Sequence, residues 1–289
     1  MSTQPQPIST AVTGLEARVG FHSDVGQARR DHDNEDRLLV FDVPARRAIA
    51  PDTAYAAGLR PAGLLLMVAD GMGGMSGGEL ASQMCVDVLP EEFTKRLGGK
   101  LATREAVRQA MAEAVRETNR RILERAKQDV KLRGMGCTLT GVLLGEGSAL
   151  ITQVGDSRAY LGRGGEVSQL TSDQTVWESL RAQGKDPEKA LGQSQFKSML
   201  LQAVGAQEDV DPAFTEMELQ AGDWMVVCSD GLYRVVTPEN IREILKTPTG
   251  PAEKARELTQ LANQNGGPDN VSVIVCQVAG ISGMKGAAA

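Results

Sequence analysis

Gly-Leu-Leu-Leu-Met-Val-Ala-Asp-Gly-Met-Gly-Gly, residues 63–74, combines an apolar run with an acid and a cluster of glycines. The continuous apolar run over 63–69 is typical of a strand that is buried on both faces. Asp70 ends the run, and glycines follow directly. Because glycine lets the backbone approach a ligand closely, we expect a buried strand that delivers one carboxylate to a binding site.

Five aspartates fall at the ends of predicted strands. They are Asp36, Asp70, Asp156, Asp230 and Asp269. Asp36 begins a strand and Asp70 ends one, so antiparallel pairing brings both to the same sheet edge. The same geometry brings Asp230, at the end of a strand, to Asp269, just before another. Clustered carboxylates repel one another and need cations, and ligation by oxygen alone suits Mg²⁺ or Mn²⁺ rather than Zn²⁺.

The order of the predicted elements favours an α+β fold with antiparallel sheets over alternating βαβ units. We expect strands at 18–24, 36–42, 63–69, 138–145, 148–154, 157–163, 166–170, 213–219, 223–229 and 271–278. We expect helices from Ser76, over 103–133, from Pro238 and over 251–264. The strands between 138 and 170 are expected to form a meander. The segment 44–62 is predicted to be a loop insertion, and 172–210 to be polar and helical, anchored by Trp177 and Leu180.

Several motifs near Asp70 resemble unrelated functional loops. Residues 74–78 fit the Gly-x-Ser-x-Gly elbow of hydrolases, but the required histidine would follow the serine. The two histidines, His22 and His32, both precede it. The segment also lacks the third glycine of a dinucleotide-binding motif and the Gly-Lys-Ser/Thr of a P-loop. Residues 31–36 resemble a calcium loop, but Asp36 stands where that loop needs glycine.

Composition argues against several classes of protein. The chain has 289 residues and a formal net charge of −6, whereas a nucleic-acid binder carries a basic surface. The first 15 residues lack the apolar core of a signal peptide, and no apolar run approaches the roughly 20 residues of a membrane helix. Four cysteines in apolar stretches are expected to be buried and reduced. We therefore expect a cytoplasmic protein with no nucleic-acid or membrane partner.

Eight stretches, in order along the chain, resemble the motifs of bacterial type-2C metal-dependent protein serine/threonine phosphatases, the PPM family. They are Gly26…Arg29-Arg30…Asn34-Glu35-Asp36, and residues 68–74, 78–82, 135–138, 154–161, 169–173, 228–232 and 267–272. The resemblance implies one phosphatase domain over 17–279, between a disordered lead (1–16) and a flexible tail (280–289). The family fold is an αββα sandwich of two antiparallel sheets, with a flap that corresponds to 172–210.

The resemblance also implies roles for particular residues. The metal-binding set is Asp36, Asp70, Gly71, Asp156, Asp230 and Asp269. Asp70 would bridge two Mn²⁺ or Mg²⁺ ions, Asp230 and Asp269 would complete one of them, and the Gly71 carbonyl would bind the other. Asp36 would hold metal-bound waters, and Asp156 with Asp230 matches the ligands of a third, weaker ion. Water activated by two cations would attack phosphorus, which makes Asp36, Asp70, Asp230 and Asp269 the predicted catalytic residues.

Two departures from the family pattern concern substrate binding and proton donation. An arginine ahead of the Asn-Glu-Asp motif should bind the substrate phosphate, because a guanidinium pairs with two phosphate oxygens. Here the loop is longer than usual, and either Arg29 or Arg30 fits. Met72 stands where many eukaryotic members have a histidine that acts as general acid, and Met cannot donate a proton. His32 is a candidate substitute, whereas His22 is expected to be structural.

The resemblance leaves three functional hypotheses. The first is an active phosphatase that hydrolyses phosphoserine and phosphothreonine in proteins, a monomer that reverses the action of a serine/threonine kinase. The second is a catalytically silent member of the same fold that binds phosphoproteins as a regulator. The third is a phosphohydrolase of small molecules. The flap at 172–210 would influence substrate choice, and 44–62 is either a docking loop or a passive insertion.

Overall fold

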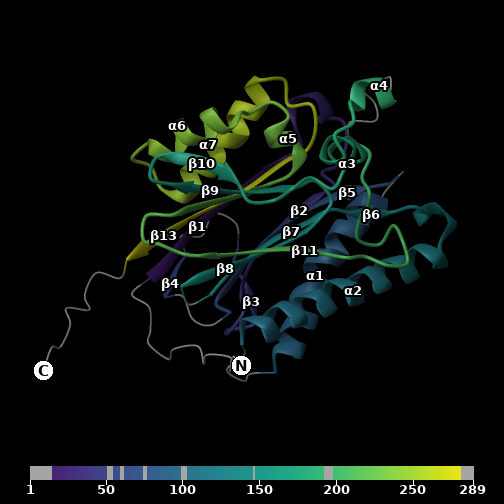
Figure 1. Ribbon diagram of the computed structural model, residues 1–289, viewed down its shortest axis with the longest axis horizontal. Coiled ribbons are helices and arrows are strands. Elements are labelled where there is room, and N and C mark those ends of the chain that lie inside the picture. Colours follow the sequence, from purple (N-terminus) through teal and green to yellow (C-terminus); the bar gives the residue numbers. More distant parts are fainter. Residues whose placement is uncertain are drawn as a thin grey trace, which may run out of the picture.

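The computed structural model describes residues 15–50, 55–58, 62–73, 77–98, 103–145, 147–191 and 198–280. Two antiparallel sheets lie face to face, and helices cover both outer faces (Figure 1). The helices α5, α6 and α7 lie on one sheet, and α1 and α2 lie on the other. This arrangement confirms the predicted α+β sandwich.

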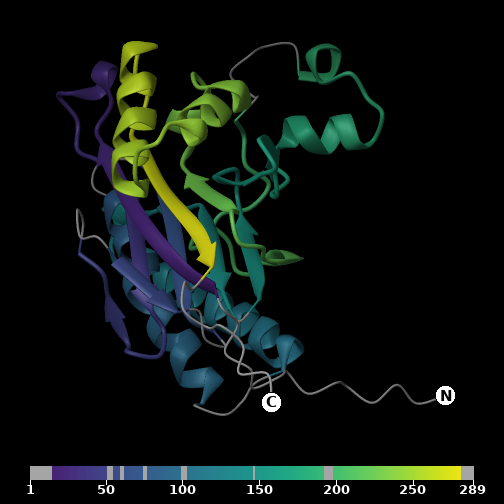
Figure 2. The same ribbon diagram turned by 90° about the vertical axis from the view of Figure 1, so that its left-hand side faces the viewer.

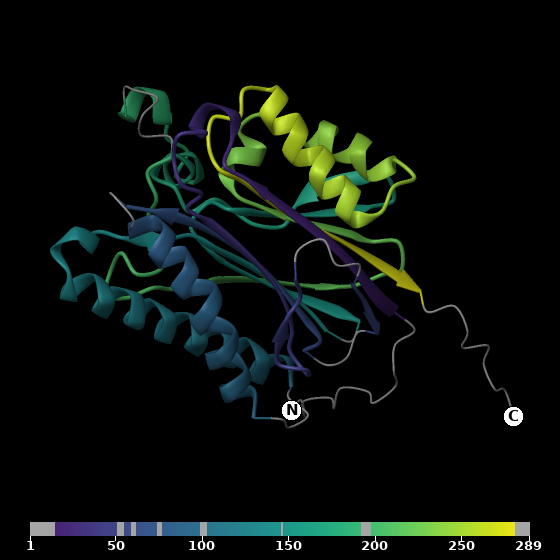
Figure 3. The ribbon, with the colours of Figure 1, turned by 180° about the vertical axis from the view of Figure 1, so that it is seen from behind.

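The first sheet has the strand order β10-β9-β12-β13-β1-β4. Its strands are β1 (Leu15–Asp24), β4 (Tyr55–Gly58), β9 (Arg158–Arg163), β10 (Glu166–Gln169), β12 (Trp224–Cys228) and β13 (Val271–Gly280). The strands β1 and β13 pair along their whole length, with Asp24 opposite Val271. Figures 2 and 3 show them side by side, in purple and yellow. This pairing places the residues just before β13 beside the turn that follows β1.

The second sheet has the order β11-β8-β7-β5-β2-β3, and β6 pairs with the end of β5. Its strands are β2 (Asp36–Asp42), β3 (Arg47–Ala48), β5 (Leu64–Met72), β6 (Gly136–Cys137), β7 (Leu139–Leu144), β8 (Ser148–Val154) and β11 (Ala213–Glu218). The central strand β5 alternates between two cores. Leu64, Leu66 and Val68 face the other sheet, whereas Leu65 and Met67 belong to the core beneath α1 and α2. Burial on both faces explains the continuous apolar run.

The helices occur in two groups and a projecting pair. They are α1 (Gly77–Leu97), α2 (Arg104–Gln128), α3 (Val176–Ala182), α4 (Pro187–Leu191), α5 (Asp230–Tyr233), α6 (Pro238–Lys246) and α7 (Pro251–Gln264), with 3-10 turns η1 (Gln27–Arg29) and η2 (Val130–Leu132). Thr237 caps α6, because its side chain accepts a hydrogen bond from the Asn240 N–H.

In the described ranges, no helix is both long enough and apolar enough to cross a membrane.

The expected meander over 138–170 is wrong, although its strands are present. β7 pairs with β8 and β9 pairs with β10, but β8 and β9 lie in different sheets. The turn between them contains Gly155 with φ 94°, where a Cβ would lie 2.8 Å from the Thr138 side chain. Only glycine fits this close, left-handed turn. The turn carries the chain from one sheet to the other and places Asp156 at that edge of the sandwich.

Three expected segments, one loop and the two termini, are also corrected. The segment 44–62 is not a plain loop, because β3 pairs with β2 and β4 pairs with β1, extending both sheets. β1 begins at Leu15, so the last two residues of the expected lead 1–16 belong to a strand. Gly280, the first residue of the expected tail 280–289, ends β13. The rest of the lead and of the tail lies outside the described residues.

The second expected helix is shorter than predicted. It ends at Gln128 instead of residue 133, because Asp129 is extended and its side chain accepts the Lys131 N–H to cap η2. The first expected helix is described from Gly77 onward. Its predicted starting residue, Ser76, lies outside the described residues.

The segment 172–210 is less helical than expected. In its described parts, 172–191 and 198–210, the α-helices are α3 and α4. Trp177 and Leu180, the expected anchors, are half-buried. The helices α3 and α4 project away from both sheets (Figure 2), whereas Val204, later in the segment, is buried and pairs with Cys137. The first residues of the segment remain tied to β9, because Arg158 pairs with Asp173 at 2.6 Å.

Candidate active site

Asp36 and Asp70 lie directly opposite each other on neighbouring strands. β2 and β5 are antiparallel, and their register pairs Asp36 with Asp70, as the sequence predicts. Asp36 is only 3% exposed, and Asp70 is half-buried. The second sheet therefore contributes two adjacent carboxylates at one edge.

The first sheet contributes a second pair at the same edge. Asp230 begins α5, two residues after β12 ends, and Asp269 lies two residues before β13 begins. Because β12 and β13 pair antiparallel, these ends meet. Arg234 forms an ion pair with Asp230 and lies 3.9 Å from Asp269, which places both carboxylates around one guanidinium.

Ser229 joins the two sheets at this edge. Its hydroxyl donates to Oδ2 of Asp36 at 2.7 Å, and it accepts the backbone N–H of Ser272 at 3.0 Å. Asn270 adds a second link, because its side-chain oxygen accepts the Glu35 N–H at 2.8 Å and its amide donates to the Val25 carbonyl. These bonds fix the distance between Asp36 and the β12–β13 end.

Backbone contacts hold Asp70 and Gly71. The Asp70 N–H donates to Oγ1 of Thr138 at 3.0 Å, and its carbonyl accepts the Thr138 N–H at 2.8 Å. A Cβ on Gly71 would lie 2.3 Å from the Gly78 carbonyl oxygen and 2.6 Å from that of Glu35. Packing alone therefore requires glycine at position 71, whether or not a ligand binds the Gly71 carbonyl.

Asp156 completes the ring of aspartates from the turn after β8. It is buried, and Tyr233 donates a hydrogen bond to its Oδ2 at 3.1 Å. The guanidinium of Arg158 stacks on the Tyr233 ring at 3.6 Å and also pairs with Asp173. The position of Asp156 is thus linked through Tyr233 and Arg158 to Asp173, at the start of the 172–210 segment.

Three carboxylates of the cluster, those of Asp36, Asp70 and Asp230, resist ionisation. Burial, opposed by hydrogen bonds from Ser229 and Ser272, raises the pKa of Asp36 to about 6. Burial also raises the pKa of Asp230 to about 7, although the nearby Arg234 lowers it. The pKa of Asp70 rises well above its ordinary value because of burial and because of repulsion from Asp230 and Asp36. Such shifts indicate more negative charge than the protein itself neutralises.

The chemistry of these residues fits divalent cations. Oδ1 of Asp36 is buried and has no hydrogen-bond partner among the described residues, and oxygen donors of this kind suit Mg²⁺ or Mn²⁺. As arranged here, however, no three His, Cys, Asp or Glu side chains in the described ranges are placed to hold one ion. Arg234 pairs with Asp230 and Arg29 pairs with Asp269. An entering cation would have to displace these guanidinium groups.

The two candidate arginines differ in position. Arg29 ends η1, pairs with Asp269 and lies 3.5 Å from the Glu35 carboxylate. Arg30, the next residue, is exposed. The loop therefore brings Arg29 into the cluster of carboxylates and leaves Arg30 exposed to solvent.

The histidines and Met72 lie around the site in different ways. His32 is exposed in the turn after η1, and Met72, at the end of β5, is 37% exposed. His22 is half-buried in β1, and its buried Nδ1 has no hydrogen-bond partner among the described residues. The structural role expected for His22 and the proton-donor role considered for His32 both stay predictions.

Sequence reasoning missed the residues that hold the aspartates in place. They are Ser229, Asn270, Thr138, Tyr233 and Arg234. Ser229 and Asn270 directly neighbour a motif aspartate, and a polar residue beside a strand-end acid was the available signal. Arg234 gave a weaker signal, four residues after Asp230, a spacing that places both side chains on one helix face.

A family model described as protein phosphatase 2C matches residues 50–264. The chain is 40% identical over 233 residues to the serine/threonine protein phosphatase PstP of Mycobacterium tuberculosis, covering 80% of this chain and 43% of that protein. It is 32% identical over 257 residues to the serine/threonine phosphatase stp of Listeria innocua, covering 89% of this chain and 94% of that one. The chain thus spans less than half the length of PstP.

Solved structures agree with these matches. The catalytic domain of PstP in complex with two manganese ions superposes with a TM-score of 0.71 at 35% identity, covering 92% of this chain and 99% of that one. The chain belongs to the protein phosphatase 2C family of metal-dependent serine/threonine protein phosphatases. Enzymes of this family act on phosphorylated proteins and use divalent metal ions.

Proposed function

We propose that this protein releases phosphate from phosphoserine and phosphothreonine in proteins, with water as the nucleophile. The observation that carries the proposal is the convergence of Asp36, Asp70, Asp156, Asp230 and Asp269 from both sheets onto one edge. Burial and repulsion from neighbouring aspartates raise the pKa of Asp70, so this edge of the sandwich needs cations to balance its charge. No nucleophilic side chain is required.

We assign the metal ligands from this cluster. Asp70, Asp230, Asp269 and the Gly71 carbonyl would hold two divalent cations, Mn²⁺ or Mg²⁺, and Asp156 with Asp230 would hold a third. When bound, the cations would activate water and offset the charge of the phosphate. Asp36, held by Ser229 at 2.7 Å, would orient water in the outer shell.

We assign the substrate phosphate to Arg29. A guanidinium can pair with two phosphate oxygens at once, and Asp269 and Glu35 already hold this one at the cluster. Arg30 is exposed and is assigned no contact with the phosphate. Substrate choice is assigned to the 172–210 segment, which begins beside Asp156 through the Arg158–Asp173 pair.

The physiological setting is part of the same proposal. A serine/threonine kinase would supply the phosphorylated substrates, and the enzyme would act as a monomer. A reducing compartment such as the cytoplasm is supported by the four cysteines, which are free and buried.

A silent phosphoprotein-binding regulator is the alternative, and one observation favours it. Arg234 and Arg29 neutralise Asp230 and Asp269 in this arrangement. If cations failed to displace them, the site would bind phosphate without hydrolysing it.

One experiment separates the two functions. The purified protein is incubated with a phosphothreonine peptide in Mn²⁺, in Mg²⁺ and in EDTA, beside the variant Asp230→Asn. An active phosphatase releases phosphate with metal and loses this release in EDTA and in the variant. A folded wild-type protein that binds the peptide but releases no phosphate with either metal is the regulator. Near-normal turnover by Asp230→Asn would refute its assignment as a ligand.

A further inference from the structure

Arg234 has an unusual position for a basic residue in a site that needs cations. It follows α5 directly, and its N–H donates to the Asp230 carbonyl, so its backbone is fixed one turn after that aspartate. Its guanidinium pairs with Asp230 and lies 3.9 Å from Oδ2 of Asp269. In the part of the chain that the structure describes, both ion pairs of Arg234 are with these two predicted metal ligands.

Two guanidinium groups therefore bracket one carboxylate. Arg29 binds Oδ1 of Asp269, and Arg234 approaches Oδ2. The side chain of Arg234 is 38% exposed, whereas that of Asp230 is only 10% exposed. Arg234 is thus the more solvent-accessible member of its pair with Asp230 and can be reached by a phosphate from solution.

The charges predict where Arg234 goes when cations bind. Cations on Asp230 and Asp269 would occupy the oxygens that Arg234 now faces and would repel its charge. The five aspartates and the dianion of a phosphomonoester carry seven negative charges, against four positive charges from the two principal cations or six with the proposed third ion. A phosphate at the cluster would therefore gain from a second guanidinium, and Arg234 would lack a carboxylate partner.

We propose that Arg234 is a second phosphate-binding arginine, which exchanges its carboxylate partners for the substrate's phosphate when the cations bind. The inference rests on the proposed function and extends it. Arg29 and Arg234 would hold the phosphate from two sides of Asp269. Tyr233, clamped between Arg158 and Asp156, would keep α5 rigid beneath Arg234.

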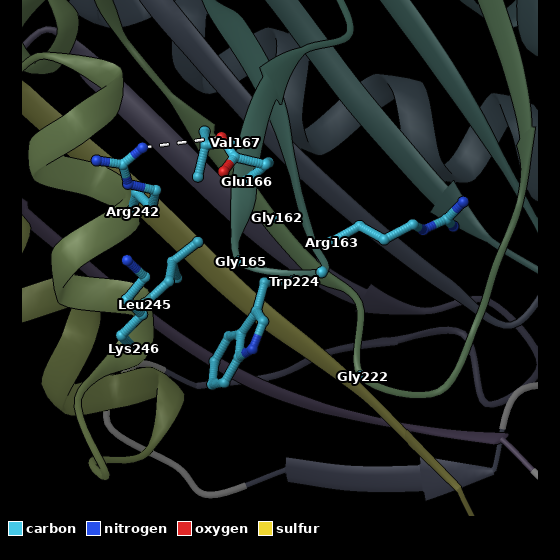
Figure 4. A pocket seen from close by; sticks show the side chains of 11 residues that line it. Gly162, Arg163, Gly165, Glu166, Val167, Gly222, Trp224, Arg242, Leu245 and Lys246 are labelled. Carbon is cyan, nitrogen blue, oxygen red and sulfur yellow. Dashed lines mark ion pairs between the residues drawn. The ribbon is translucent and has the colours of Figure 1, made fainter.

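The test measures binding of inorganic phosphate and of Mn²⁺ by calorimetry, in Arg234→Gln, Arg234→Lys and wild type. Arg242→Gln is the matched control, because Arg242 lines a cavity of about 140 Å³ beside Trp224, at the opposite end of β12 (Figure 4). Its ion pair with Glu166, at 3.7 Å, involves none of the site residues. Urea unfolding of each variant confirms that it is folded.

For the Mn²⁺-loaded protein, Arg234→Gln should weaken phosphate binding about 10- to 100-fold. Arg234→Lys, which keeps the charge, should restore part of the loss, and Arg242→Gln should bind as wild type does. Mn²⁺ should bind Arg234→Gln more tightly than wild type, because the competing guanidinium is gone. A purely structural role would not tighten metal binding.

Unchanged phosphate binding by Arg234→Gln would overturn the inference. If the wild-type protein also releases phosphate from the peptide, only the assignment of Arg234 fails. If the wild-type protein releases no phosphate with either metal, the proposed function fails, and the calorimetric comparison of the variants still decides the role of Arg234.

Discussion

Glu92 on α1 and Asp36 on β2 are both buried carboxylates, 5% and 3% exposed, but their surroundings are opposite. Glu92 pairs with Arg96 and, at 2.5 Å, with Arg121. The hydrogen bond from Arg96 is the chief reason that the pKa of Glu92 is lowered. Asp36 instead lies opposite Asp70, and burial raises its pKa to about 6.

The difference separates a structural acid from a functional one. At Glu92 the chain supplies the cations itself, so the charge is satisfied once the protein folds. At the aspartate edge, the edge of the sandwich where Asp36, Asp70, Asp156, Asp230 and Asp269 converge, carboxylates face one another. At least one oxygen there, Oδ1 of Asp36, has no hydrogen-bond partner among the described residues. Burial alone does not mark a site, but burial without compensation leaves a charge that something from outside must balance.

The largest effect is expected for Asp70→Asn at the uncompensated edge. Turnover of a phosphothreonine peptide with Mn²⁺ should fall on the order of 1000-fold, since this variant removes the proposed bridging ligand. The metal-free protein should unfold at higher urea than wild type, because the substitution removes a repelling buried charge. Activity assays and urea unfolding in EDTA measure both changes. A loss of activity with a lower unfolding midpoint would contradict this account.

Glu92→Gln should show the reverse pattern. It leaves Arg96 and Arg121, whose side chains are 25% and 38% exposed, without their carboxylate partner. We expect a loss of about 2 kcal/mol in the free energy of unfolding, because solvent screens part of the lost charge-assisted hydrogen bonds. Turnover should stay at the wild-type level, because none of the site residues contacts Glu92 in the described ion pairs. Urea unfolding measures the change in stability, and the phosphothreonine-peptide assay measures turnover. A protein of wild-type stability would mean that this cluster is solvated and contributes little.

The comparison also shows which features the sequence could predict. The apolar run before Asp70 predicts a doubly buried strand, and antiparallel pairing predicts that Asp36 lies beside it, because both inferences need only local pattern and strand direction. The assignment of β8 and β9 to different sheets depends on long-range pairing, which a run of short strands does not specify. The choice between Arg29 and Arg30 depends on the turn η1, which brings Arg29 to Asp269 and leaves Arg30 exposed.

Arg29 and Arg30 provide a smaller contrast within one loop. Arg29→Ala should lower kcat/KM for the peptide about 10- to 100-fold, since a charge-assisted pair with the phosphate is lost. Arg30→Ala, an equal change of charge on the adjacent exposed residue, should leave kcat/KM near the wild-type value. Steady-state kinetics at saturating Mn²⁺ compare the two variants. A larger loss in Arg30→Ala would reverse the assignment.

The smallest effect concerns pH and distinguishes the two clusters without mutation. In the metal-free protein the pKa values of Asp36 and Asp230, about 6 and about 7, exceed the ordinary value near 4. The native state therefore holds more protons than the unfolded state between these limits, and stability falls as pH rises through them. The free energy of unfolding in EDTA should be about 2 kcal/mol higher at pH 5.5 than at pH 7.5.

Saturating Mn²⁺ should abolish or invert this difference, because protons compete with the cation for the same oxygens. Glu92, with its lowered pKa, loses its contribution only at lower pH, as the carboxylate becomes protonated. A metal-free protein that is more stable at pH 7.5 than at pH 5.5 would show that the aspartate edge is already compensated.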